Sequence, residues 1–78
     1  MVTRSLPIHS LDYEELSRWF SLTPPPYSEK DILDFNRIYR RVYPRLSRQE
    51  QRKAEWLVDV VISQLERPNL AALIYGVV

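Results

Sequence analysis

Apolar side chains recur every three or four residues in three stretches of the chain, and prolines separate these stretches. In the first stretch, Tyr13, Leu16 and Trp19 share one face of a helix at about 100° per residue. The second stretch places its apolar residues opposite three arginines, and the third has the longest apolar stripe. The predicted order is an N-terminal arm at residues 1–9, helices at 10–22, 28–43 and 47–66, a proline-rich linker at 23–27, and a short helix at 69–75.

Capping signals support two of these helix starts. Ser28 is followed three residues later by Asp31, and Ser47 is followed by Glu50 at the same spacing. A serine and an acidic residue at this spacing are typical of a capping box, in which each side chain accepts a hydrogen bond from the backbone of the other. Pro44 disfavours helical geometry in the residue before it, so the second helix is predicted to stop near Tyr43.

The predicted fold class is all-α, a compact bundle of three main helices plus a short fourth C-terminal helix. A single glycine in 78 residues argues against β-hairpins, whose turns need positive φ. The first helix can be capped by Ser10 or by Asp12. A single domain of this length has a small core, so we also expect self-association into a homo-oligomer.

Charge is segregated along the chain. Residues 37–53 contain seven basic side chains and one acid, a net charge of +6, whereas the other 61 residues contain four basic side chains and nine acids, a net charge of −5. Such a cluster is either an ordinary solvated face or a surface that binds something negative. The partner-binding residues predicted from it are Arg37, Arg40, Arg41, Arg45, Arg48, Arg52, Lys53 and the nearby Trp56.

Two classes of partner fit this surface. The first hypothesis is a small interaction or regulatory module that binds another protein with an acidic surface. The alternative is a helix-turn-helix-like nucleic-acid-binding regulator that uses the start of the third helix. A helix-turn-helix protein places its base contacts there, and the residues at this position are Arg48, Gln49, Arg52 and Lys53. A turn that contains proline instead of glycine and a net charge of only +1 weaken this alternative.

Trp56 and Val60 form a second apolar patch on the third helix, away from its main stripe. The patch is either covered by the first or fourth helix or open to a partner. An exposed tryptophan beside arginine is typical of residues that dominate interface energetics.

Two proline motifs have the form of peptide ligands. Pro24, Pro25 and Tyr27 belong to a P-P-x-Y sequence, the ligand pattern of WW domains, and residues 43–46 have the Y-P-x-L pattern used by some viral proteins. The structural alternatives are a stiff linker for the first motif and a helix stop with a buried turn for the second.

Enzyme chemistry has little support in the sequence. The chain has no cysteine, and its one histidine, His9, lies in the predicted arm, so we expect no catalytic residues, no metal site and no cofactor. A subunit whose active site is completed by another chain is the weakest hypothesis. The longest apolar run has nine residues and includes Gly76, which is too short for a membrane span, and we expect a cytoplasmic location.

Overall fold

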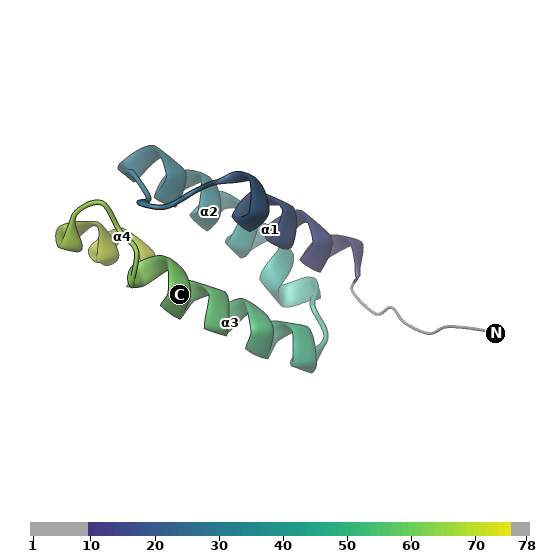
Figure 1. The fold of residues 1–78 in the computed structure, drawn as a ribbon. Coiled ribbons are helices and arrows are strands. Elements are labelled where there is room, and N and C mark those ends of the chain that lie inside the picture. Colours follow the sequence, from purple (N-terminus) through teal and green to yellow (C-terminus); the bar gives the residue numbers. More distant parts are fainter. Residues whose placement is uncertain (1–9, 76–78) are drawn as a thin grey trace.

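The computed structural model describes residues 10–75, which form helices joined by short turns (Figure 1). The predicted all-α bundle of three main helices and a short fourth is confirmed. The N-terminal arm, with His9, lies outside the described residues, as does Gly76 of the C-terminal apolar run. The elements are α1 (Leu11–Leu22), α2 (Glu29–Val42), the 3₁₀ helix η1 (Tyr43–Arg45), α3 (Arg48–Ile62), the 3₁₀ helix η2 (Pro68–Leu70) and α4 (Ala71–Tyr75).

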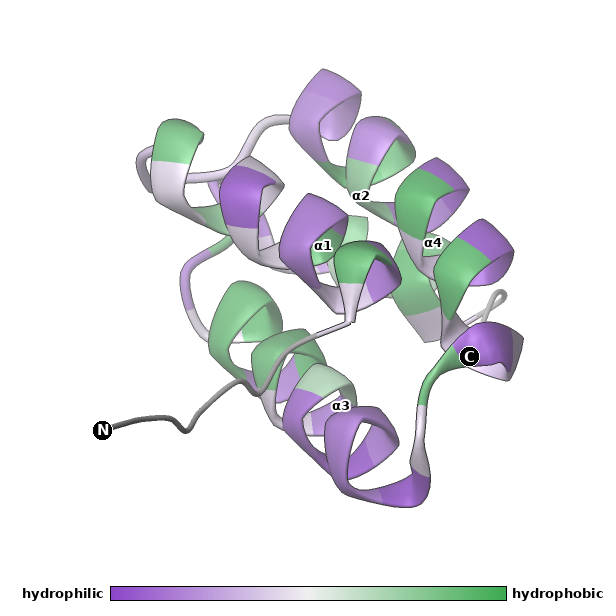
Figure 2. Ribbon diagram, turned by 90° about the vertical axis from the view of Figure 1, so that its right-hand side faces the viewer, coloured by the Kyte–Doolittle hydropathy of each residue, from purple (hydrophilic) through white to green (hydrophobic). Residues whose placement is uncertain are grey.

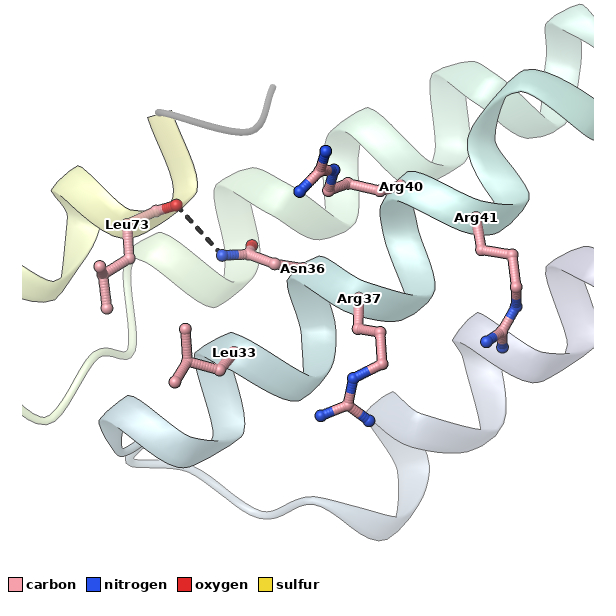
Figure 3. A pocket seen from close by; sticks show the side chains of 6 residues that line it. All are labelled: Leu33, Asn36, Arg37, Arg40, Arg41 and Leu73. Carbon is pink, nitrogen blue, oxygen red and sulfur yellow. Dashed lines mark hydrogen bonds between the residues drawn. The ribbon is translucent and has the colours of Figure 1, made fainter.

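The three main helices surround a common interior (Figure 2). α1 packs along α2 and also contacts α3, whereas α4 contacts α2 and α3. The side-chain amide of Asn36 on α2 attaches α4, because its Nδ2 donates a hydrogen bond of 3.1 Å to the carbonyl oxygen of Leu73 (Figure 3). α2 therefore connects the N-terminal and C-terminal parts of the chain, because it packs against both α1 and α4.

The core contains the apolar faces that the sequence predicts. Leu16, Ile32, Phe35 and Val61 are completely buried, and a row of aromatic rings continues this core along α1 and α2. Ring centroids in this row are separated by 5.5 Å for Trp19 and Tyr27, 5.0 Å for Trp19 and Phe35, 5.5 Å for Phe35 and Tyr39, and 5.0 Å for Tyr39 and Tyr43. Large aromatic side chains let a short chain bury much surface with few residues.

α3 ends at Ile62, four residues before the predicted end at residue 66. The reason is a contact with the linker, because the Tyr27 N–H donates to Gln64 O at 3.0 Å and the Glu66 N–H donates to Tyr27 O at 2.8 Å. These bonds hold residues 64–66 beside the linker in an isolated parallel bridge between Tyr27 and Leu65. A helical pattern in the sequence carries no information about this distant pairing.

The C-terminal helix also begins differently from the prediction. Pro68 opens the 3₁₀ helix η2, and α4 follows from Ala71, so Asn69, the predicted first residue of the short helix, lies within η2. Proline suits this first turn because its fixed φ is helical and it has no N–H to satisfy.

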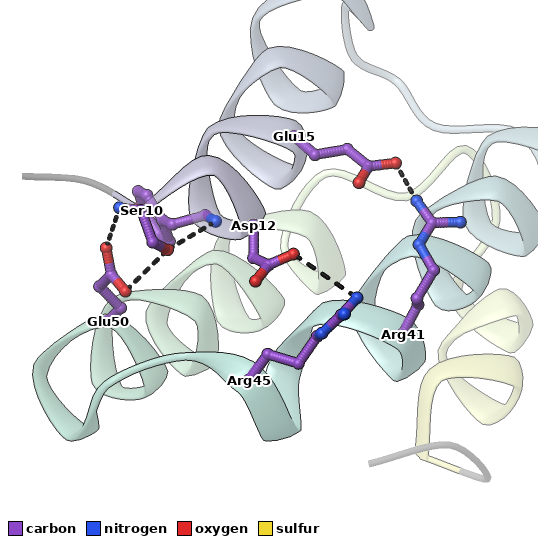
Figure 4. A network of polar contacts seen from close by, with 7 residues as sticks. Ser10, Asp12, Glu15, Arg41, Arg45 and Glu50 are labelled. Carbon is purple, nitrogen blue, oxygen red and sulfur yellow. Dashed lines mark hydrogen bonds and ion pairs between the residues drawn. The ribbon is translucent and has the colours of Figure 1, made fainter.

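One carboxylate joins the N-termini of α1 and α3 (Figure 4). Glu50 Oε2 accepts a hydrogen bond of 2.7 Å from the Ser10 N–H, and Oε1 accepts one of 3.0 Å from the Ser10 hydroxyl. The predicted capping box is also present, since Ser47 Oγ accepts from the Glu50 N–H and Glu50 Oε1 accepts from the Ser47 N–H. Ser10 in turn caps α1 by accepting from the Tyr13 N–H at 3.2 Å.

The environment of Glu50 favours its ionised form. Its side chain is buried, and the hydrogen bond from the Ser10 N–H, aided by those from the Ser10 hydroxyl and Ser47, lowers the pKa of Glu50 below its ordinary value of 4.5 against the opposing effect of burial. Folding therefore stabilises the carboxylate form.

Replacing Glu50 with glutamine is expected to lower the free energy of unfolding by about 1 to 3 kcal/mol at neutral pH, because buried N–H and O–H donors lose a charged acceptor. A lowered folded-state pKa gives stability that is present above the unfolded pKa and lost as pH falls through the folded pKa. Urea unfolding of wild type and Glu50→Gln across pH should therefore give curves that converge in acid. The exposed Glu66→Gln should give no such difference, and a constant gap at all pH values would contradict the role of the Glu50 charge.

Leu57→Ala is expected to lower the free energy of unfolding by about 2 to 5 kcal/mol, because it removes volume from a side chain that is only 4% exposed. Trp56→Ala should cost less than about 1 kcal/mol, because that side chain is 61% exposed. Chemical denaturation of both variants measures the difference. Equal losses would show that Trp56 is part of the core.

Candidate functional site

The basic cluster in the sequence is divided between two outer sides of the bundle. The buried faces of α2 and α3 both point to the shared interior, so the side chains opposite those faces point away from each other. Arg37 and Arg41 lie on the outer side of α2, and Arg48 and Arg52 lie on the outer side of α3. The predicted single surface is therefore two surfaces.

Three of these arginines are paired with acids. Arg41 forms an ion pair with Glu15 of α1, and Arg45 Nη1 lies 3.9 Å from Asp12 Oδ1 (Figure 4). Arg37 Nη2 lies 2.8 Å from Asp34 Oδ1 one turn earlier on α2. Exposed ion pairs of this kind contribute only about 0 to 1 kcal/mol each, but they neutralise much of the positive charge beside α1.

Of the four remaining basic residues of the cluster, Arg48, Arg52 and Lys53 lie on α3, and Arg40 lies on α2. Arg48, Arg52 and Trp56 follow one another at four-residue spacing and form a line on the solvent side of the helix, which we call the α3 stripe. The stripe spans about 12 Å. Within residues 10–75, neither arginine has an ion-pair partner, and Trp56 is 61% exposed. Neither α1 nor α4 covers the Trp56 side chain, whereas Val60 one turn later is half-buried.

Lys53 occupies a different position beside the stripe. Its Nζ lies 6.0 Å from the centre of the Tyr13 ring, at the outer limit for a cation–π contact. Lys53 thus lies at the junction of α3 with α1.

A groove borders α2 on the side where α4 is attached (Figure 3). Its volume is about 660 Å³, and the residues that line it, here called the α2 groove, are Leu33, Asn36, Arg37, Arg40, Arg41 and Leu73. Arg37 and Arg41 point toward α1, whereas Arg40 points to the other side of α2. Arg40 has no ion-pair partner in the described part of the chain. Asn36 Oδ1 is buried and accepts no hydrogen bond from the described residues.

The P-P-x-Y motif is part of the core. Tyr27 is 1% exposed, its ring stacks on Trp19, and both of its backbone polar groups are bonded to residues 64–66. Binding to the aromatic groove of a WW domain requires this tyrosine to be accessible. The WW-ligand hypothesis for Pro24, Pro25 and Tyr27 therefore does not fit this conformation. In the Y-P-x-L segment, Leu46 is also buried and the first three residues form η1, as in a helix stop with a buried turn.

The side chains at the start of α3 that would contact nucleic acid are accessible to a ligand. Arg48, Gln49, Arg52 and Lys53 are all exposed. Arg37 and Arg41 of α2 do not extend this surface, since they point toward α1.

The acidic residues and the helix lengths of the described part of the chain bear on metal binding and on membrane crossing. Between residues 10 and 75, no three histidine or acidic side chains gather closely enough to hold a metal ion. The one buried acid in this part of the chain, Glu50, is used by the two helix caps. The helices seen in the structure are too short and too polar to cross a lipid bilayer.

Comparison with known proteins gives no relative, because no protein-family model, no curated protein and no solved structure matches the chain.

The folded chain is expected not to bind an isolated WW domain, because the Tyr27 ring is buried. A synthetic peptide of residues 21–29, in which the tyrosine is free, is the matched control, and titration of a fluorescent WW domain with each measures the difference. Equal affinities would show that the linker leaves the core readily.

Proposed function

We propose that this chain is a small non-catalytic module that binds an acidic surface of another protein through the α3 stripe. The observation that carries the proposal is an exposed tryptophan in line with two arginines that have no ion pair among residues 10–75. Tryptophan and arginine are enriched among the residues that contribute most to binding, because each combines a large contact area with directional polar groups. The absence of cysteine agrees with a cytoplasmic location for such a module.

The charge of the stripe favours an acidic partner. Arg48 and Arg52 project from the first two turns of α3, and a guanidinium group can donate two parallel hydrogen bonds to the two oxygens of a carboxylate. Neighbouring unpaired cations attract an acidic surface from a distance and then hold it in register. The Trp56 ring and the half-buried Val60 beside it supply apolar contact at the C-terminal end of the stripe.

A protein partner fits better than a nucleic-acid duplex. Affinity for a duplex depends on many phosphate contacts along a continuous basic surface. Here Arg37, Arg41 and Arg45 are paired with acids, and those on α2 face away from the α3 stripe. A narrow stripe that ends in a large apolar ring is more typical of a protein interface.

The proposal is tested by Arg48→Glu combined with Arg52→Glu, and separately by Trp56→Ala. Both variants should keep the helical circular dichroism spectrum, because the side chains are exposed. A partner captured with wild-type protein and then purified should bind each variant at least about tenfold more weakly in calorimetry. The matched control is Arg18→Glu with Lys30→Glu, which reverses the same amount of charge at exposed sites outside the stripe.

Two results would overturn this function. One is unchanged affinity in both stripe variants. The other is binding of a random DNA duplex with a steep loss of affinity as salt rises, abolished by the arginine reversals, because that dependence is typical of phosphate contacts.

A further inference from the structure

Two grooves of opposite charge border the short helix α4. One is the α2 groove, where Arg40 has no ion-pair partner within residues 10–75. The other, here called the α3 groove, has a volume of about 320 Å³. It is lined by Tyr39, Glu55, Val58, Asp59, Ile62 and Tyr75.

The two grooves lie on either side of the strip of α2 that α4 covers. The bond from Asn36 to Leu73 places α4 over one strip of the α2 surface. Successive helix residues are separated by about 100°, so Tyr39 and Arg40 lie on either side of that strip one turn further along α2. Leu73 of α4 lines the α2 groove and Tyr75 lines the α3 groove. The face around the end of α4 therefore has a cation on one side, an acidic rim on the other, and aromatic and aliphatic side chains between them.

The acids of the α3 groove differ in how they are used. Glu55 accepts a hydrogen bond from the Tyr43 hydroxyl. Asp59 is exposed and has no ion-pair partner in the described part of the chain, like Arg40 across the face. The two unpaired charges are thus of opposite sign and border the same apolar centre, where Tyr75 is 66% exposed.

We propose that this face, formed by the α2 groove and the α3 groove around α4, binds a second copy of the chain in a two-fold symmetric dimer. A two-fold axis requires that each contact of one copy with its partner occur twice, with the roles exchanged. A face with a cation on one side and an anion on the other meets this requirement, because rotation by half a turn brings Arg40 of each copy to Asp59 of the other. The exposed Tyr75 rings meet at the centre, where they lose contact with water.

Charge complementarity selects a second copy over an unrelated acidic partner. An acidic peptide would satisfy Arg40 but would be repelled by Asp59 and Glu55 on the same face. A second copy satisfies both sides at once. The dimer face adjoins the α3 stripe, since Asp59 lies three residues after Trp56 on α3. The two proposals can still fail separately, because their tests change different residues and measure different binding events.

The test uses sedimentation equilibrium of the whole chain from about 1 µM to about 1 mM, a range that includes weak dimers. Wild-type protein should show a monomer–dimer equilibrium. Arg40→Glu and Asp59→Arg should each raise the dissociation constant at least about tenfold, because each places two pairs of like charges across the axis. An equimolar mixture of the two variants should dimerise again, because each Arg40→Glu chain then meets an Asp59→Arg chain with both charge pairs restored.

Matched controls are Arg18→Glu and Glu66→Arg, which reverse exposed charges away from this face and should leave dimerisation unchanged. Circular dichroism of every variant checks the fold. If one charge-reversal variant does not fold, the dissociation constant of the other is still compared with that of wild type. The proposal is overturned by a wild type that remains monomeric throughout the concentration range. It is equally overturned by dimerisation that is unaffected by both reversals, or by a mixture that does not recover.

Discussion

The Glu50 carboxylate connects the first and third helices of this fold. It accepts hydrogen bonds from the backbone N–H and hydroxyl of Ser10 at the start of α1 and from the backbone N–H of Ser47 at the start of α3. Helix N-termini have N–H groups without helical partners and a partial positive charge, so one buried anion can stabilise two of them. The position of α1 against α3 therefore depends on a polar contact that loses strength when the carboxylate is protonated.

The other connection between distant parts of the chain is aromatic. Tyr27 lies in the linker after three prolines, yet it is almost completely buried, stacks on Trp19 and has its backbone bonded to residues 64–66. This single residue joins the end of α1, the start of α2 and the end of α3. A segment with the form of an exposed peptide ligand thus contributes to the core, because a small domain needs every large ring to bury enough surface.

The positive charge that remains on the surface depends on which basic side chains form ion pairs. Part of the basic cluster neutralises the acids of α1 through Arg41 and Arg45, which holds α1 beside α2 and η1. Three arginines of the cluster have no ion-pair partner in residues 10–75, and they are Arg48 and Arg52, in line with the exposed Trp56 on α3, and Arg40, which lines the α2 groove. Recognition by a partner protein is proposed on the α3 stripe, and pairing of two copies is proposed on the neighbouring face around α4.

Local features of this protein are determined by its sequence alone. The capping boxes at Ser28 and Ser47, the apolar faces of the helices and the all-α class all depend on residues within about four positions of one another, where helical geometry dictates which side chains meet. The early end of α3, the burial of Tyr27 and the division of the arginines between two surfaces were decided by tertiary structure. Each depends on residues more than a helix length apart in the chain, and their contacts arise only when the helices pack.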